Sequence, residues 1–132
     1  DGRERIARRV AEVAHVARLP VSELRLPPSL KGYDAGGVVA YSRICTHAGC
    51  AISMYRAPLF QPDEPRPALV CPCHYSTFDP ATGGTVTFGP AGRDLPMLPL
   101  YVDSSGYVRA KGNFNGPVGP SWWGVRMWKA QS

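Results

Sequence analysis

Two short segments hold all four cysteines and two of the three histidines of this 132-residue chain. They read CTHAGC at residues 45–50 and CPCHYS at residues 71–76. Thiolates and imidazoles are ligands for borderline and soft transition metals, and cysteine pairs also form disulfides. Because so many reactive side chains fall in two brief runs, we expect the fold to present the two segments as neighbouring loops.

Each segment holds one cysteine and one histidine at close spacing, and these four residues are Cys45, His47, Cys71 and His74. From a single tight loop, such a pair can direct a thiolate and an imidazole at one ion or cluster. Cys50 and Cys73 are left over, one in each segment. A four-ligand site together with one disulfide between the loops would therefore use all six residues.

The residues by themselves leave simpler alternatives open. Two ordinary disulfides would use the four cysteines, but they leave the paired histidines unexplained. A structural zinc site takes two cysteines and two histidines tetrahedrally, although its usual spacings are C-x₂₋₄-C and H-x₃₋₅-H. Here the spacings are C-x-H and C-x₂-H, and zinc does not account for the additional cysteine pair.

The rest of the chain predicts an all-β scaffold for the two loops. Gly 14 and Pro 14 exceed a fifth of the chain, which favours short strands and turns over long helices. Residues 38–42 (VVAYS) and 68–70 (ALV) are predicted strands that lead into the cysteine segments. Residues 76–88 and 98–111 are predicted hairpins, each with glycine in its turn.

Three other segments carry weaker local predictions. Apolar residues recur at helical spacing over residues 3–18, so a short N-terminal helix ending near Leu19 is predicted. Residues 21–26 alternate loosely and predict a strand. Residues 56–67 contain four prolines and predict an exposed loop.

Charge and hydropathy exclude some classes of function. The net charge is +5, but six Arg face four acidic residues over residues 1–25, and nine basic residues face six acidic ones over the remainder. The excess is spread thinly and has no basic cluster interleaved with aromatics, so nucleic-acid binding is not expected. No run of about 18 apolar residues is present, so no bilayer-spanning segment is expected within this sequence.

The paired motif CTHAGC…CPCHYS resembles the Rieske iron–sulfur signature C-T-H-x-G-C…C-P-C-H-x-S of cytochrome bc and b6f complexes. The flanking stretch FGPAGRDLPMLPL…GNFNGPVGPSWW is most similar to Rieske subunits of actinobacterial-type menaquinol:cytochrome c complexes. The resemblance covers roughly residues 36–123. It implies that residues 1–132 form a single domain of Rieske fold.

Within that fold, the resemblance implies two parts. An antiparallel β-sandwich or barrel base would comprise about residues 1–43 and 95–132. A small cluster-binding subdomain, at about residues 44–94, would be inserted into it.

The resemblance also implies a ligand set for one 2Fe-2S cluster per chain. The ligands would be Cys45 and Cys71 on one iron, with His47 and His74 on the other. Cys50 and Cys73 would form a disulfide that ties the loops together. Two histidines in place of two cysteines raise the potential to about −150 to +300 mV, because neutral imidazoles leave the oxidised cluster less negative.

The histidine ligation further implies that electron transfer is coupled to a proton. The N–H that each imidazole keeps is more acidic when the iron is oxidised. A quinol that is hydrogen-bonded to His47 or His74 could therefore give up a proton and an electron together.

Other positions are expected to tune or cover the cluster. Ser76 matches a serine whose hydroxyl donates to a bridging sulfide and raises the potential. Phe78 stands where ubiquinol-type members have a tyrosine that bonds a cysteine ligand, so a lower potential, suited to menaquinol, is expected. Pro90 belongs to the loop that closes over the cluster, where Gly92 replaces the second proline of the usual G-P-A-P. Two further departures from the family pattern are Ala48 for Leu and Tyr75 for Gly.

The function that the resemblance implies is that of an electron-transfer subunit. It would oxidise quinol with a cytochrome b subunit and pass the electron to a c-type cytochrome. The disulfide indicates oxidising space, so the expected location is the extracytoplasmic face of the bacterial plasma membrane, with an N-terminal anchor upstream of Asp1. The alternatives are the small Rieske subunit of an arsenite-oxidase-type enzyme and a Rieske ferredoxin.

Overall fold

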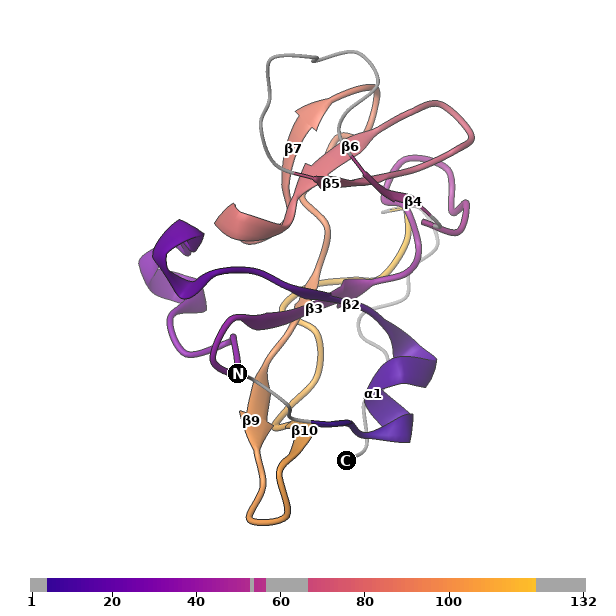
Figure 1. The fold of residues 1–132 in the computed structure, drawn as a ribbon. Coiled ribbons are helices and arrows are strands. Elements are labelled where there is room, and N and C mark those ends of the chain that lie inside the picture. Colours follow the sequence, from indigo (N-terminus) through magenta and orange to yellow (C-terminus); the bar gives the residue numbers. More distant parts are fainter. Residues whose placement is uncertain (1–4, 53, 57–66, 121–132) are drawn as a thin grey trace.

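The structure is a computed structural model that describes residues 5–52, 54–56 and 67–120 (Figure 1). In these ranges the chain forms three small β-sheets, one short α-helix and three 3₁₀ turns. The predicted β class is confirmed. Most of the predicted loop at residues 56–67 lies outside the described residues, and so does the chain from residue 121 onward.

The elements in chain order are β1 (Arg5–Ile6), α1 (Arg8–Val13), β2 (Ala14–Arg18), η1 (Val21–Glu23), η2 (Pro28–Leu30), β3 (Val38–Ser42), β4 (Met54–Arg56), β5 (Ala68–Val70), β6 (Thr77–Asp79), η3 (Pro80–Thr82), β7 (Thr85–Phe88), β8 (Met97–Leu98), β9 (Leu100–Val102) and β10 (Tyr107–Ala110). They form a lower sheet (β1-β10-β9), a middle sheet (β2-β3-β8) and an upper sheet (β4-β5-β6-β7). Figure 1 shows the sheets in that order from bottom to top. The strand pairs are antiparallel except for β1 with β10, which is parallel.

Strand β3 is buried along its whole length and contributes to two separate cores. Val39 and Tyr41 belong to an upper core with side chains of the upper sheet. Val38 and Ala40 belong to a lower core with side chains of the lower sheet. Successive side chains on a strand point to opposite faces, so the middle sheet is a wall shared by both cores.

The N-terminal segment differs from the prediction. The helix predicted over residues 3–18 is limited to α1, which ends at Val13, and residues 14–18 form β2 instead. β2 pairs antiparallel with all five residues of β3. This pairing satisfies backbone groups of a strand that is buried on both faces, and it outweighs the local helix propensity of an Ala-rich segment. No helix in the described ranges is long and apolar enough to cross a membrane.

The strand predicted at residues 21–26 is also wrong. Val21–Glu23 form a 3₁₀ turn that Pro20 precedes, and the backbone N–H of Glu23 donates to the Pro20 carbonyl at 2.9 Å. The loose alternation of this segment reflects partial burial of its apolar side chains against the upper core, to which Leu24 and Leu26 contribute.

The other predicted strands and hairpins are confirmed. β3 and β5 lie where the β-branched and apolar runs predict them, and β9 and β10 form the predicted hairpin. The turn between β6 and β7 contains Gly83 and Gly84, with φ of 94° and 81°. A Cβ on Gly84 would lie 2.5 Å from the carbonyl oxygen of Leu95, so this turn requires glycine for space as well as for conformation.

Candidate metal centre

The first cysteine segment is a loop that leaves the end of β3. The backbone N–H of Cys45 donates to the Cys50 carbonyl at 2.8 Å, and that of Gly49 donates to the Cys45 carbonyl at 3.1 Å. Gly49 has a φ of 82°, in the left-handed region that glycine tolerates. These bonds close the loop on itself at the end of β3, the central strand of the middle sheet.

The second cysteine segment is the loop between β5 and β6. The backbone N–H of Cys71 donates to the Ser76 carbonyl at 2.9 Å, and that of Tyr75 donates to the Cys71 carbonyl at 2.9 Å. Tyr75 has a φ of 62°. The second loop therefore repeats the backbone pattern of the first, with tyrosine where the first loop has glycine.

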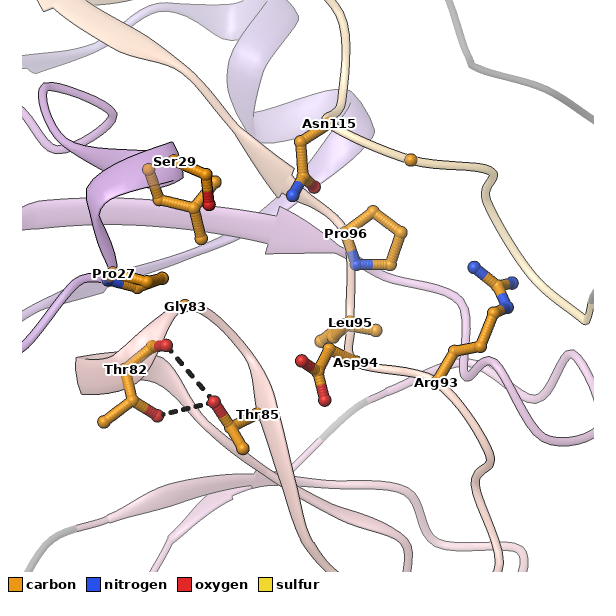
Figure 2. Close-up of a pocket in the computed structure, with 12 residues that line it drawn as sticks. Pro27, Ser29, Thr82, Gly83, Thr85, Arg93, Asp94, Leu95, Pro96 and Asn115 are labelled. Atoms are coloured by element: carbon orange, nitrogen blue, oxygen red, sulfur yellow. Dashed lines mark hydrogen bonds between the residues drawn. The ribbon is translucent and has the colours of Figure 1, made fainter.

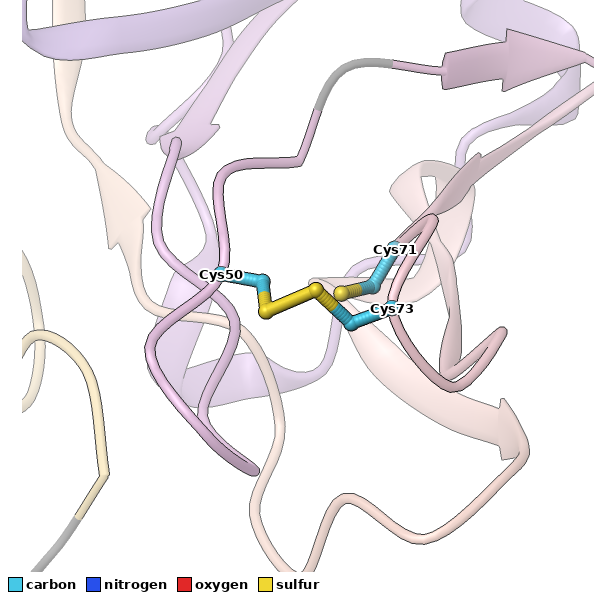
Figure 3. A group of neighbouring side chains, drawn as sticks. All are labelled: Cys50, Cys71 and Cys73. Atoms are coloured by element: carbon cyan, nitrogen blue, oxygen red, sulfur yellow. A yellow bond between two sulfur atoms is a disulfide. The ribbon is translucent and has the colours of Figure 1, made fainter.

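A disulfide joins the two loops, as the sequence resemblance implied (Figure 3). Cys50 and Cys73 are bonded at 2.03 Å, with their Cα atoms 6.5 Å apart. Their sulfurs and that of Cys71 lie within 4.8 Å of one another. Because two of these three sulfurs are bonded to each other, only the Cys71 thiol of this group is available as a ligand.

The two remaining cysteines are free thiols in the interior. Cys45 is 1% exposed and Cys71 is 2% exposed. Burial raises the pKa of the Cys45 thiol, while the backbone N–H of His47, which points to the Cys45 sulfur at 3.5 Å, lowers this pKa, and the neighbouring Cys71 raises it. Buried thiols of this kind ionise when a metal supplies positive charge, so this donor set fits a bound cation or cluster.

The two imidazoles lie on the outer side of the thiols. The rings of His47 and His74 are 5.0 Å apart between centroids and nearly perpendicular, at 84°. His47 is half-buried and His74 is exposed. The four side chains that the sequence singled out are thus divided into an inner pair of thiols and an outer pair of imidazoles, an arrangement that fits a mixed-ligand 2Fe-2S cluster.

A third loop, residues 89–93, is held against both cysteine loops. The Thr46 hydroxyl donates to the Arg93 carbonyl at 2.7 Å, and the Ser76 hydroxyl accepts from the backbone N–H of Ala91 at 3.1 Å. A Cβ on Gly89 would lie 2.6 Å from the Ser76 Cα, so glycine permits this close approach. Pro90 and Gly92, the positions expected to cover the cluster, are exposed on this loop.

The third loop is also attached to the C-terminal segment. The Arg93 guanidinium donates to the carbonyls of Pro117 and Gly119. Sequence reasoning did not single out Thr46, Gly89 or Arg93. The glycine before Pro90 was a local sequence signal for Gly89. Thr46 and Arg93 gave no such signal, because their acceptors are backbone carbonyls, which a sequence does not identify.

The two positions expected to tune a cluster are both fully buried. Ser76 and Phe78 are each 0% exposed. The Ser76 oxygen accepts a backbone N–H, so its hydroxyl hydrogen is available for another acceptor. Phe78 lies on β6 opposite Leu69 of β5 and Val86 of β7, and its phenyl ring has no donor.

Figure 2 shows a cavity of the described region that is separate from the cysteines and histidines. It measures about 310 Å³, and its lining includes residues of η2 and η3 and residues 93–96 and 115–116. The Thr85 hydroxyl on its wall is bonded to Thr82. None of the cysteines or histidines lines it. His15, the third histidine, lies on β2 opposite Tyr41 of β3, with its ring 6.2 Å from that of Tyr55.

The fold and the paired cysteine loops define an iron–sulfur protein class, and comparison with known families agrees. Residues 12–99 match the Rieske [2Fe-2S] domain family. This range contains both cysteine loops and the third loop. The chain therefore belongs to the Rieske family, and membership implies a 2Fe-2S cluster.

Several known proteins are similar to this chain. A cytochrome bc1 complex Rieske iron–sulfur subunit of Streptomyces lividans is 44% identical over 114 residues, covering 82% of this chain and 63% of that protein. The corresponding subunit of Streptomyces coelicolor is also 44% identical over 114 residues, but these cover only 30% of that protein. The chain thus spans less than two thirds of these relatives.

Two other similarities extend the comparison. A Haloferax mediterranei protein bearing the name of a respiratory nitrate reductase Rieske subunit is 50% identical over 88 residues, which cover 67% of this chain and 36% of that protein. The crystal structure of the soluble domain of Rieske protein II (soxF) from Sulfolobus acidocaldarius superposes with a TM-score of 0.52 at 28% identity, covering 88% of this chain and 56% of that one. The Rieske fold that the sequence predicted is therefore confirmed.

Proposed function

We propose that this chain is the cluster-carrying domain of a Rieske subunit in a cytochrome bc1-type complex. With a cytochrome b subunit it oxidises quinol, and it passes the electron to a c-type cytochrome. The observation that carries this proposal is the pairing of two buried thiols with two outer imidazoles on loops joined by a disulfide. The similarity to the Streptomyces subunits supports it.

The proposed ligands of the single 2Fe-2S cluster are Cys45 and Cys71 for one iron and His47 and His74 for the other. When bound, the cluster supplies a one-electron acceptor. The thiols lie inside the upper core, so the protein keeps water away from the sulfur side of the site. The imidazoles lie outside, where a partner can reach them.

In this proposal the imidazoles hydrogen-bond to the quinol and accept its proton. The hydroxyl of a quinol hydrogen-bonds to the ring nitrogen of His47 or His74 that is not used as a ligand. When it carries no proton of its own, that nitrogen would accept the quinol proton, and the bound cluster would supply the acceptor for the electron. The exposed His74 and the half-buried His47 are both accessible for this role.

The proposed quinol is menaquinol. Ser76 raises the potential through the hydroxyl hydrogen that its contact with Ala91 leaves available. Phe78 has no hydroxyl to add a second such bond, so the potential suits a more strongly reducing quinol. An equilibrium titration that found the potential as high as in tyrosine-containing relatives would contradict this assignment.

The proposal also divides the domain into a base and a cluster-binding subdomain, and it assigns a cellular location. Residues 1–43 and 95–132 form the base, and residues 44–94 form the cluster-binding subdomain; the four strands of the upper sheet fall between residues 54 and 88. The disulfide suits the extracytoplasmic side of the plasma membrane. An N-terminal anchor of the full-length protein holds the domain at that membrane.

A second candidate differs in the electron acceptor. The Haloferax relative bears the name of a respiratory nitrate reductase subunit, so the same quinol-facing domain could serve a reductase module in place of a c-type cytochrome. The two candidates share the cluster and the quinol. They differ in which redox partner copurifies with the full-length subunit.

Electron paramagnetic resonance of the full-length subunit, purified with its membrane partners and reduced with ascorbate or dithionite, tests the proposal. A rhombic signal of low average g with two irons and two labile sulfides per chain is expected. Zinc in place of iron, with no signal, would refute the redox function. Copurification with a c-type cytochrome or with a nitrate reductase decides between the two acceptors.

A further inference from the structure

The two cysteine loops provide an internal comparison at one backbone position. Gly49 and Tyr75 each donate their N–H to the carbonyl of the cysteine that opens the loop. Both lie in the left-handed region, with φ of 82° at Gly49 and 62° at Tyr75. The first loop therefore shows which residue this turn favours, and the second loop departs from it.

A tyrosine at this position is disfavoured by its own backbone. A Cβ in the left-handed region crowds the following carbonyl, and glycine avoids this contact. Tyr75 is the only non-glycine residue with positive φ in the part of the chain that the structure describes. Its conformation is enforced on both sides, because its N–H donates to Cys71 and its carbonyl accepts the Thr77 hydroxyl at 3.0 Å.

The side chain of Tyr75 is only partly buried. It is 39% exposed, whereas large aromatic residues that support this fold, such as Tyr41 and Phe78, are fully buried. A residue that is unfavourable for its turn and only partly packed is explained better by a function than by stability. Because the ring is partly exposed, we look for that function in a contact made at the protein surface.

Tyr75 follows His74, the exposed imidazole of the proposed cluster. The surrounding loops, at residues 44–52, 71–78 and 89–93, contain a single charged residue, Arg93, whose guanidinium donates to carbonyls of the C-terminal segment. The imidazole pair is thus framed by loops that carry one charge, which is bonded to the C-terminal segment, and one exposed phenol ring. Such a face suits an apolar, uncharged partner surface, and tyrosine is a residue that often dominates binding at contacts of this kind.

We propose that Tyr75 is a partner-contact residue: its ring packs against the uncharged surface that holds the hydroquinone beside His74. This inference rests on the proposed function and adds a residue that determines how tightly the imidazole face docks. The backbone strain of the loop is the cost of presenting that ring.

The test compares Tyr75→Gly and Tyr75→Phe in the full-length subunit, assembled with its membrane partners. The rate of cytochrome c reduction by dimethylnaphthoquinol is measured per cluster, with cluster content taken from the resonance signal. We expect Tyr75→Gly to lower kcat/KM about tenfold, as loss of one good aromatic contact does. The same variant should raise the Tm of the subunit by about 4 °C, because glycine relieves the left-handed turn.

The opposite signs of these two effects distinguish a contact role from a structural one. Tyr75→Phe keeps the ring and should stay within about twofold of wild type in kcat/KM, a change of about 0.4 kcal/mol. Tyr101→Ala is a matched control, because Tyr101 is also 39% exposed but lies on β9 of the lower sheet. It should leave the rate per cluster unchanged.

Three results would overturn the inference. They are a wild-type rate in Tyr75→Gly, a lower Tm in that variant, and a loss in Tyr75→Phe equal to that in Tyr75→Gly. If the wild-type assembly reduced no cytochrome c from the quinol, the proposed function would fail, and this inference would fail with it. A normal wild-type rate with an unaffected Tyr75→Gly would remove the inference alone.

Discussion

At the scale of single residues, Phe78 is a position where adding one oxygen atom is expected to change the reduction potential. It is fully buried on β6, in the same core as the free thiols Cys45 and Cys71. Phe78→Tyr adds a hydroxyl that can donate to a cysteine sulfur and favour the reduced cluster. One hydrogen bond is worth about 1 kcal/mol, or about 40 mV for a one-electron couple.

We therefore expect Phe78→Tyr to raise the reduction potential by about that amount in an equilibrium redox titration. Phe114→Tyr is the matched control, because Phe114 is 1% exposed but belongs to the lower core. It should cost stability without moving the potential. An unchanged potential in Phe78→Tyr would show that the hydroxyl does not reach the cluster ligands.

His15 predicts a pH dependence of folding that is separate from the redox site. Burial lowers the pKa of His15 below 6.5, and the positive charge of Arg43 lowers it further. Its Nδ1 is buried and has no hydrogen-bond partner among the described residues. Since the folded state holds this imidazole less readily protonated than the unfolded state does, its contribution to stability is present above pH 6.5 and is lost as pH falls through the folded pKa.

Thermal unfolding of wild type and His15→Gln at pH 7 and pH 5 checks this expectation. The wild type should lose more Tm on acidification than the variant does. Equal losses in both proteins would mean that His15 does not contribute to the pH dependence.

Sequence motifs predicted the residues of the site but not how they are held. The six cysteines and histidines could be named because ligand chemistry restricts residue type and spacing. Thr46 and Arg93 could not, because their partners are backbone carbonyls 47 and 24 or 26 residues away. Tyr75 was visible as a departure from the family pattern, but its left-handed backbone required the structure.

At the scale of elements, the contact between the third loop and the second cysteine loop depends on Gly89. Its φ is 93°, and a Cβ there would lie 2.6 Å from the Ser76 Cα and 2.9 Å from its nitrogen. Gly89→Ala should therefore push residues 89–92 away from Ser76. We expect a loss of about 1–3 kcal/mol in stability, together with a lower potential as the Ser76 hydroxyl is displaced.

Gly92→Ala in the same loop is the control for this prediction. A Cβ on Gly92 meets nothing within 4 Å, and its φ is outside the left-handed region. It should retain wild-type stability and potential, measured by denaturant unfolding and redox titration. Equal behaviour of the two variants would show that close packing at Gly89 is unimportant.

Strands and helices could be predicted where the local sequence pattern and the tertiary packing favour the same secondary structure. The run VVAYS predicts β3 because a strand buried on both faces needs consecutive apolar residues. The N-terminal segment was mispredicted because its helix-forming residues also supply the edge partner of β3. That demand comes from a strand whose paired residues lie 20 to 28 positions away, so no local window contains it.

At the scale of the whole molecule, the disulfide is a covalent cross-link between the two cysteine loops. It closes a sequence separation of 23 residues, which corresponds to about 3 kcal/mol of unfolded-state entropy. Cys50→Ser and Cys73→Ser should each lower the Tm of the cluster-loaded protein and yield fewer clusters per chain by iron and sulfide analysis. Full occupancy and wild-type Tm in both variants would contradict this expectation.

The position of β3 between two cores has a consequence for how such a protein can change over time. Cys45 and Cys71 face the upper core, whereas Val38 and Ala40 of β3 face the lower one. A sheet therefore separates the reactive sulfurs from the lower core. In a lineage that enters a hotter habitat, substitutions in the lower core are therefore expected to change heat tolerance more than they change the surroundings of the sulfurs.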